Sequence, residues 1–173
     1  MKNTALLLVI LMVVIASVAQ TKLLSVCEIV AHVSDWNNNV VLIQAHYHSG
    51  FEDSFLFDEK CPGKEIWLDY PESAAKEDAL LNDTQRTKRT FVSLDKDAKF
   101  PEFERYASVR DKHNPMCQQL EIEIAAVGRV DTKRGVAPKK NCQPFGMCNY
   151  PARFVLATIR QVSAGESMQP CRK

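Results

Sequence analysis

Two histidines separated by one residue, His46 and His48, are the side chains whose types and spacing best suit chemistry in this sequence. Residues two apart on a strand point to the same face, so both imidazoles could reach one metal ion. A third ligand would come from Glu52, Asp53 or the distant His113. The simpler interpretation is two polar side chains on a solvent-facing strand, and we prefer it, so the sequence alone assigns no metal ligand and no cofactor.

Aromatic residues cluster in the same part of the sequence. The cluster consists of Tyr47, Phe51, Phe55, Phe57, Trp67 and Tyr70. Alternation along a strand requires about half of these rings to point into the core. The remaining rings, beside polar side chains, would suit an unknown protein, peptide or glycan ligand through stacking. We therefore predict a binding surface made of His46, His48, Phe55, Phe57 and Trp67.

The sequence contains no recognisable catalytic motif. No G-x-S-x-G occurs, and cysteines that form disulfides cannot serve as nucleophiles. Glu121 and Glu123 share one face of a strand, but outward glutamates at alternate positions are the usual polar side of such a strand. We predict no catalytic residues and a non-catalytic binding or envelope-associated module. Two alternatives remain open, a secreted metal-dependent hydrolase using His46 and His48, and an inhibitor of a secreted enzyme.

The charge distribution disfavours a nucleic-acid partner. The chain has 22 Lys and Arg against 21 Asp and Glu. Binding to a phosphate backbone requires clustered positive charge. The densest basic stretches, residues 86–89 and 133–140, are interrupted and lie in loop-like sequence.

Five predicted strands would position these side chains, at about residues 40–48, 53–59, 65–70, 120–130 and 152–162. In the first strand the side chains assigned to the core are Val41, Ile43, Ala45 and Tyr47. In the fourth strand, the alternation directs Glu121, Glu123 and Arg129 outward. Gly128 interrupts the inward-facing set, which is typical of a bulge or a barrel corner.

Two short helices complete the pattern. Ser25 and Glu28 form a capping box for a helix at residues 25–36, and Pro101 suits the first turn of a helix at 100–112. Between the third and fourth strands, residues 72–98 are polar and read as a surface insertion. The order strand–strand–strand–helix–strand–strand is that of a small OB-like barrel. We therefore predict a mainly β fold, a five-stranded OB-like barrel with an N-terminal helix, in a single domain at 20–173.

Several short segments carry a resemblance. They are SVCE at 25–28, VVLIQAHYHSG at 40–50, LFDEKCP at 56–62, the helix ahead of the fourth strand, AAVGRVD at 125–131 and YPARFVLATIRQVS at 150–163. Together they resemble a family of uncharacterised exported bacterial proteins. The resemblance implies an OB-like barrel and export, and it implies no activity. Cys117, Cys142, Cys148 and Cys171 depart from the family pattern.

The N-terminal residues predict export. Lys2 precedes an apolar run at residues 5–15, and the small residues Ser17 and Ala19 suit the −3 and −1 positions of a cleavage site after Ala19. The apolar run is about half the ~20 residues needed to cross a bilayer. We expect a signal peptide at 1–19, a periplasmic or extracellular location and no transmembrane segment after cleavage. Asn82 begins a glycosylation sequon, which matters only if the source organism glycosylates secreted proteins.

The six cysteines at 27, 61, 117, 142, 148 and 171 predict three disulfides in an exported chain. Zinc is the rival, but the spacing of Cys142 and Cys148 is wider than usual for zinc ligands. The predicted topology pairs Cys117 with Cys171 at the base of a hairpin, Cys142 with Cys148 in its loop, and Cys27 with Cys61. Lipid attachment at Cys27 is disfavoured, because the bulky Val26 precedes it where lipoprotein signals have a small residue.

Overall fold

The computed structural model describes residues 22–49, 54–97, 99–110, 120–132, 144–146 and 149–166. Its strands are β1 (Leu23–Ser25), β2 (Asn39–Ser49), β3 (Ser54–Phe57), β4 (Glu65–Asp69), β5 (Leu120–Asp131) and β6 (Arg153–Glu166). Its helices are α2 (Val26–Ala31), the 3-10 helix η1 (Val33–Trp36), α3 (Pro71–Asp78), α4 (Asp83–Thr87) and α5 (Phe100–Ala107).

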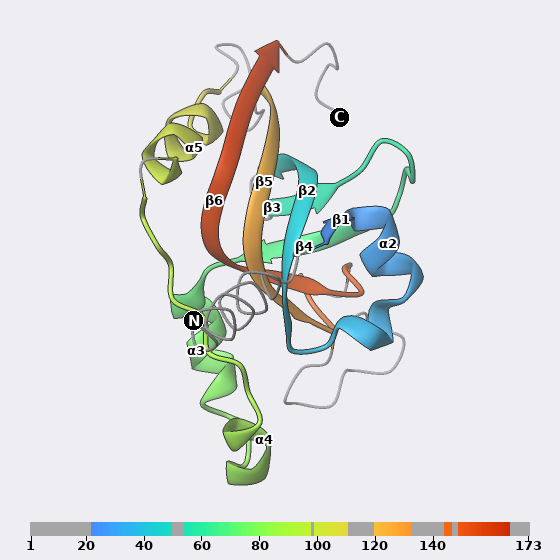
Figure 1. Cartoon of the computed structure of the whole chain (residues 1–173), viewed down its shortest axis with the longest axis vertical. Coiled ribbons are helices and arrows are strands. Elements are labelled where there is room, and N and C mark those ends of the chain that lie inside the picture. The colour runs from blue at the N-terminus through green and yellow to red at the C-terminus, as the bar shows by residue number, and fades with distance from the viewer. Residues whose placement is uncertain are drawn as a thin grey trace, which may run out of the picture.

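Five of the strands close into a barrel (Figure 1). The order is β2-β3-β4-β6-β5, and β5 pairs again with β2. All neighbours are antiparallel except β4 and β6, which are parallel. The predicted mainly β, five-stranded barrel with short helices is confirmed. The short strand β1, which no sequence pattern indicates, pairs with β2 in parallel beside the barrel.

The barrel interior is apolar, as the alternation predicts. All four side chains of β2 that the sequence assigned inward are buried, namely Val41, Ile43, Ala45 and Tyr47. Helix α5 lies against β5 and β6 and contributes the buried Phe100 and Phe103. The Phe103 ring meets Tyr47 edge-on, with ring centroids 4.9 Å apart. Tyr70 packs on Phe100, and burial raises the pKa of its hydroxyl to about 12.

Gly128 lies at a bulge, where the sequence predicts a bulge or a barrel corner, and the extra residue belongs to the partner strand β6. The register between β5 and β6 shifts between Val127 and Gly128. A Cβ atom at position 128 would lie 2.5 Å from both the Phe154 ring and the Val155 carbonyl oxygen. Only glycine therefore allows the two strands to approach this closely at the corner.

The helical segments differ in length from the predictions. Residues 25–36 form α2 and then η1, which are separated at His32. The capping box is present, because the Glu28 N–H donates to Ser25 Oγ and the Glu28 carboxylate accepts from the Ser25 N–H. Helix α5 ends at Ala107, earlier than residue 112. The insertion carries helices α3 and α4, which extend from the lower end of the barrel in Figure 1.

Candidate binding face and metal-ligand cluster

The five residues of the predicted binding surface lie on adjacent strands and on the outer side of the barrel. In the antiparallel register, His46 lies opposite Phe57 and His48 lies opposite Phe55. Trp67 on β4 lies opposite Phe55 on its other side. All five side chains are partly exposed. The structure therefore brings the five together, while their role in binding stays a prediction.

Stacked rings make this surface continuous. The ring of His46 lies 5.3 Å from Phe57, and that of His48 lies 4.9 Å from Phe55, centroid to centroid. Phe55 and Phe57 are 6.1 Å apart. These contacts fix the orientation of the rings, since aromatic pairs at such distances prefer tilted or edge-on packing.

Tyr150 extends the surface and was not singled out in the sequence. Its ring is buried between Phe55 and Trp67, at 5.9 and 5.5 Å. The neighbouring Gly146 has a φ of +52°, and a Cβ there would collide with the rings of Trp67 and Tyr150. The segment before β6 thus reaches back onto β4. We call the six residues His46, His48, Phe55, Phe57, Trp67 and Tyr150 the aromatic face.

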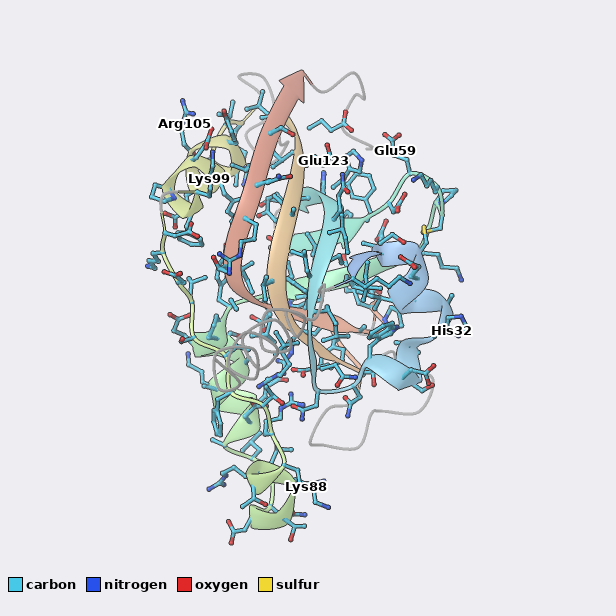
Figure 2. All side chains as sticks on the ribbon, in the orientation of Figure 1. His32, Glu59, Lys88, Lys99, Arg105 and Glu123 are labelled. Atoms are coloured by element: carbon cyan, nitrogen blue, oxygen red, sulfur yellow. A yellow bond between two sulfur atoms is a disulfide. The ribbon has the colours of Figure 1, made fainter. Side chains whose placement is uncertain are left out.

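A cluster of metal-ligating side chains borders the aromatic face at His46. The Nδ1 atom of His46 lies 3.0 Å from Oε1 of Glu121 on β5. Glu59, in the turn after β3, brings a third ligand atom, and the three atoms lie within 4.8 Å of one another. In Figure 2 the labelled Glu59 lies at the upper end of the barrel, near the disulfide.

This cluster differs from the metal site that the sequence suggested. His48 is not among the three residues that converge within the described part of the chain. The third ligands considered from the sequence, Glu52, Asp53 and His113, lie outside the described residues. Strand register explains the difference, because neither Glu59 nor Glu121 is close to His46 in sequence.

The disulfide between Cys27 and Cys61 fixes the turn that carries Glu59. The bond joins α2 to the end of the turn after β3, with the two Cα atoms 5.8 Å apart. The predicted pairing of these two cysteines is confirmed. The predicted pairs Cys117–Cys171 and Cys142–Cys148 fall on residues outside the described ranges.

A second group of charged side chains is buried between the barrel wall and the insertion. Arg129 does point outward from β5 as predicted, yet it is only 1% exposed because α3 and the chain after α4 cover it. Its guanidinium donates to Asp131 at 2.9 Å, to Asp78 of α3 at 2.8 Å and to the Thr90 carbonyl oxygen. No local sequence pattern indicates this burial, since the covering residues Thr90 and Asp78 are 39 and 51 positions away from Arg129.

Asp131 is the centre of this buried ionic network. Its carboxylate also accepts from Arg89 at 2.6 Å and from Arg153 at 2.8 Å. Burial lowers the pKa of Arg89, whereas Asp131 and the carboxylates around Arg153 outweigh burial and raise the pKa of Arg153. We name the set Asp69, Glu77, Asp78, Arg89, Arg129, Asp131 and Arg153 the ionic network.

The ionic network is structural. A cavity of about 290 Å³ lies beside it under α3, and its lining includes Ala74, Arg86 and Phe91. The charged groups at the base of the cavity, Arg129 and Asp78, are already engaged with each other and with their neighbours. They therefore hold the insertion in place.

Among the described residues, no helix has the length and apolar character that a membrane crossing requires. Comparisons with models of protein families, with curated proteins and with solved structures gave no match.

Proposed function

We propose that this chain is an exported, non-catalytic binding module whose ligand lies on the aromatic face. The observation that supports the proposal is the group of partly exposed rings on β2 and β3, which the buried Tyr150 joins to the partly exposed Trp67 on β4. OB-like barrels commonly bind their ligands on the outer side of this three-strand meander. The polar edges of the two imidazoles lie beside apolar rings, a combination that suits a glycan, a peptide or a protein.

Two features support export. The N-terminal sequence has the pattern of a secretory signal, with cleavage expected after Ala19. The Cys27–Cys61 disulfide is of the kind that persists in oxidising compartments. The resemblance to exported bacterial proteins agrees with this proposal. N-terminal sequencing of the secreted protein should begin at Gln20, and retention of residues 1–19 in the secreted form would contradict it.

The binding proposal is tested by probing immobilised glycans and peptides with the wild-type protein and with Phe55→Ala. A stacking ring contributes about 1–3 kcal/mol to binding, so removing it should weaken the affinity about 5- to 150-fold. Phe91→Ala is the matched control, because Phe91 is 75% exposed and lies on the insertion, away from the aromatic face. Equal losses in the two variants, or no binding to any probe by the wild type, would overturn the proposal.

The two other functions predicted from the sequence stay predictions. A metal-dependent hydrolase would turn over ester, peptide or glycosidic substrates only with added metal, and His46→Ala would abolish the turnover. An inhibitor would block a secreted protease or glycosidase at a one-to-one ratio without being consumed. The binding module is the better supported of the three, since the aromatic face needs no further group to bind a ligand.

A further inference from the structure

We propose that His46, Glu59 and Glu121 together bind one divalent cation of the zinc class. The inference goes beyond the binding module, because it concerns a different chemistry and does not require the aromatic face to have a ligand. The site would use one imidazole nitrogen and two carboxylate oxygens, all of which are regular zinc ligands.

The three ligands come from three separate elements that the barrel brings together. His46 lies on β2 and Glu121 on β5, which are antiparallel neighbours, and the two residues are diagonal to each other in the register. Glu59 follows β3, which pairs with the other edge of β2. Two residues later, Cys61 fastens this turn to α2 through the disulfide. Strand pairing and the disulfide thus hold the three ligand residues close together before any metal ion binds.

The contact between His46 and Glu121 supports a cation between them. The Nδ1 atom of His46 is buried and has no hydrogen-bond partner of acceptable geometry, although Oε1 of Glu121 lies only 3.0 Å away. Two atoms that both carry lone pairs repel each other at this distance unless a cation lies between them. A proton on Nδ1 would need to point along the line to the oxygen, and the poor alignment leaves that arrangement weak.

A metal ion can bind both atoms, because coordination does not require the straight N–H···O line that a hydrogen bond needs. Zinc bonds to nitrogen and oxygen are about 2.0–2.2 Å, so a tetrahedral angle separates two ligand atoms by about 3.4 Å. The observed 3.0 Å is close to this value. The third ligand atom, from Glu59, lies within 4.8 Å of the others. Glu59 is exposed, so rotation of its side chain can complete the set.

The charges and ligand types favour zinc over calcium or magnesium. Two carboxylates neutralise a divalent ion, and an imidazole ligand selects zinc, copper, nickel or iron over the harder cations, which prefer oxygen alone. Three protein ligands leave the fourth zinc position open to water or to a donor atom of a bound ligand. The three ligands border the aromatic face, because the ring of Phe57 packs on that of His46.

Zinc titration of the metal-free protein by calorimetry tests the proposal, with Co²⁺ as a spectroscopic probe. The wild type should bind one Zn²⁺ per chain, and Co²⁺ should give the absorption bands of a low-coordinate site. Glu59→Gln and Glu121→Gln should each weaken zinc binding tenfold or more, because each removes a charged ligand.

Glu123→Gln provides the matched control. Glu123 lies on the same strand and the same face as Glu121, but its carboxylate accepts a hydrogen bond from Gln44 at 2.6 Å. This variant should bind zinc within threefold of the wild type. Thermal unfolding of each metal-free variant verifies that the barrel is intact, so a loss of zinc binding cannot be attributed to unfolding.

Two outcomes would overturn the metal site. One is a wild type that shows no saturable zinc binding at millimolar concentrations. The other is an equal loss of affinity in the three glutamine variants, which would indicate only diffuse attraction by acidic side chains. Phe55→Ala separates this proposal from the binding module, since that variant should lose ligand binding and keep zinc. Zinc binding can thus fail while glycan or peptide binding persists, and the reverse also holds.

Discussion

The outward face of β5 carries charged side chains at both ends, and the two ends have opposite environments. Glu121 and Glu123 at the upper end are partly exposed, whereas Arg129 and Asp131 at the lower end are buried. In Figure 2 the labelled Glu123 lies in the upper part of the barrel, and Lys88 marks the insertion at the lower end. Side chains that the alternation directs to the same face of β5 are therefore exposed at one end of the strand and buried at the other.

The difference shows that alternation sets the direction of a side chain and not its burial. Burial depends on what covers the strand from elsewhere in the chain, here α3 and the residues after α4. The covered lower end is joined to its cover by ion pairs, while the open upper end has the Cys27–Cys61 disulfide nearby. The two ends should therefore respond to different perturbations.

Asp131→Ala should have the largest effect of all, because it removes the carboxylate that accepts from three guanidinium groups. Removing one partner of a buried ion pair costs about 3–5 kcal/mol, since the remaining charge stays buried without compensation. Urea unfolding followed by circular dichroism would measure the loss.

Glu123→Ala is the control at the open end. A partly exposed charge contributes about 0–1 kcal/mol, so this variant should unfold close to the wild type. If the two alanine variants lost similar amounts of stability, the contrast between the two ends would be wrong.

Replacing both Cys27 and Cys61 with serine should lower the free energy of unfolding by about 2–4 kcal/mol, because the bond no longer restricts the unfolded chain. Hydrogen exchange would locate the effect. Amides of the turn after β3 should exchange faster, and those of α3 should keep their protection. Faster exchange throughout α3 would instead mean that the two ends are strongly coupled.

Gly128→Ala affects the boundary between the two ends and should cost about 1–3 kcal/mol through overpacking. The added methyl group would collide with the Phe154 ring and with the Val155 carbonyl oxygen, which is backbone and cannot rotate away. Thermal unfolding would measure the cost. A neutral substitution would show that β5 and β6 can separate at the bulge without penalty.

Glu28→Gln should have the smallest effect, and one that depends on pH. The hydrogen bond from Lys22 and that from the Ser25 N–H lower the pKa of Glu28 from 4.5 to about 2. A lowered pKa means that the charge stabilises the fold above pH 4.5 and that this stabilisation disappears as the pH falls towards 2. Melting temperatures of the wild type and the variant should differ at pH 7 and converge near pH 2. A gap that is constant with pH would contradict the assignment.

Much of the barrel could be predicted because its signals are local. The alternation in β2 and β5, the capping box at Ser25 and the bulge at Gly128 each depend on a few adjacent residues. The strand β1 was missed because only three residues form it, and its pairing with β2 is not visible in its own sequence. The end of α5 also differs from the prediction, since the helix ends at Ala107 and not at residue 112.

The candidate sites could be predicted only in part. The short β2–β3 hairpin places His46 beside Phe57 and His48 beside Phe55. A hairpin is a local feature, so these neighbours could be predicted from the sequence. The partners from distant segments could not be found, namely Glu59, Glu121 and Tyr150 around the aromatic face, and the insertion over Arg129. Glu59 lies beyond the end of the β2–β3 hairpin. The other contacts join segments whose relative position depends on barrel closure or on the fold of the insertion, which no local pattern encodes.

Closure of the barrel also constrains the order in which the chain can fold. β2, β3 and β4 follow one another as a meander, but their outer edges pair with β5 and β6, which are synthesised much later. The edge of β2 stays unpaired until β5 is available, and the edge of β4 stays unpaired until residues 153–166 follow. Unpaired edges invite association with other chains. Non-local pairing of this kind is slow. We therefore expect refolding in milliseconds to seconds, and we expect truncation before β6 to give aggregates rather than a smaller folded unit.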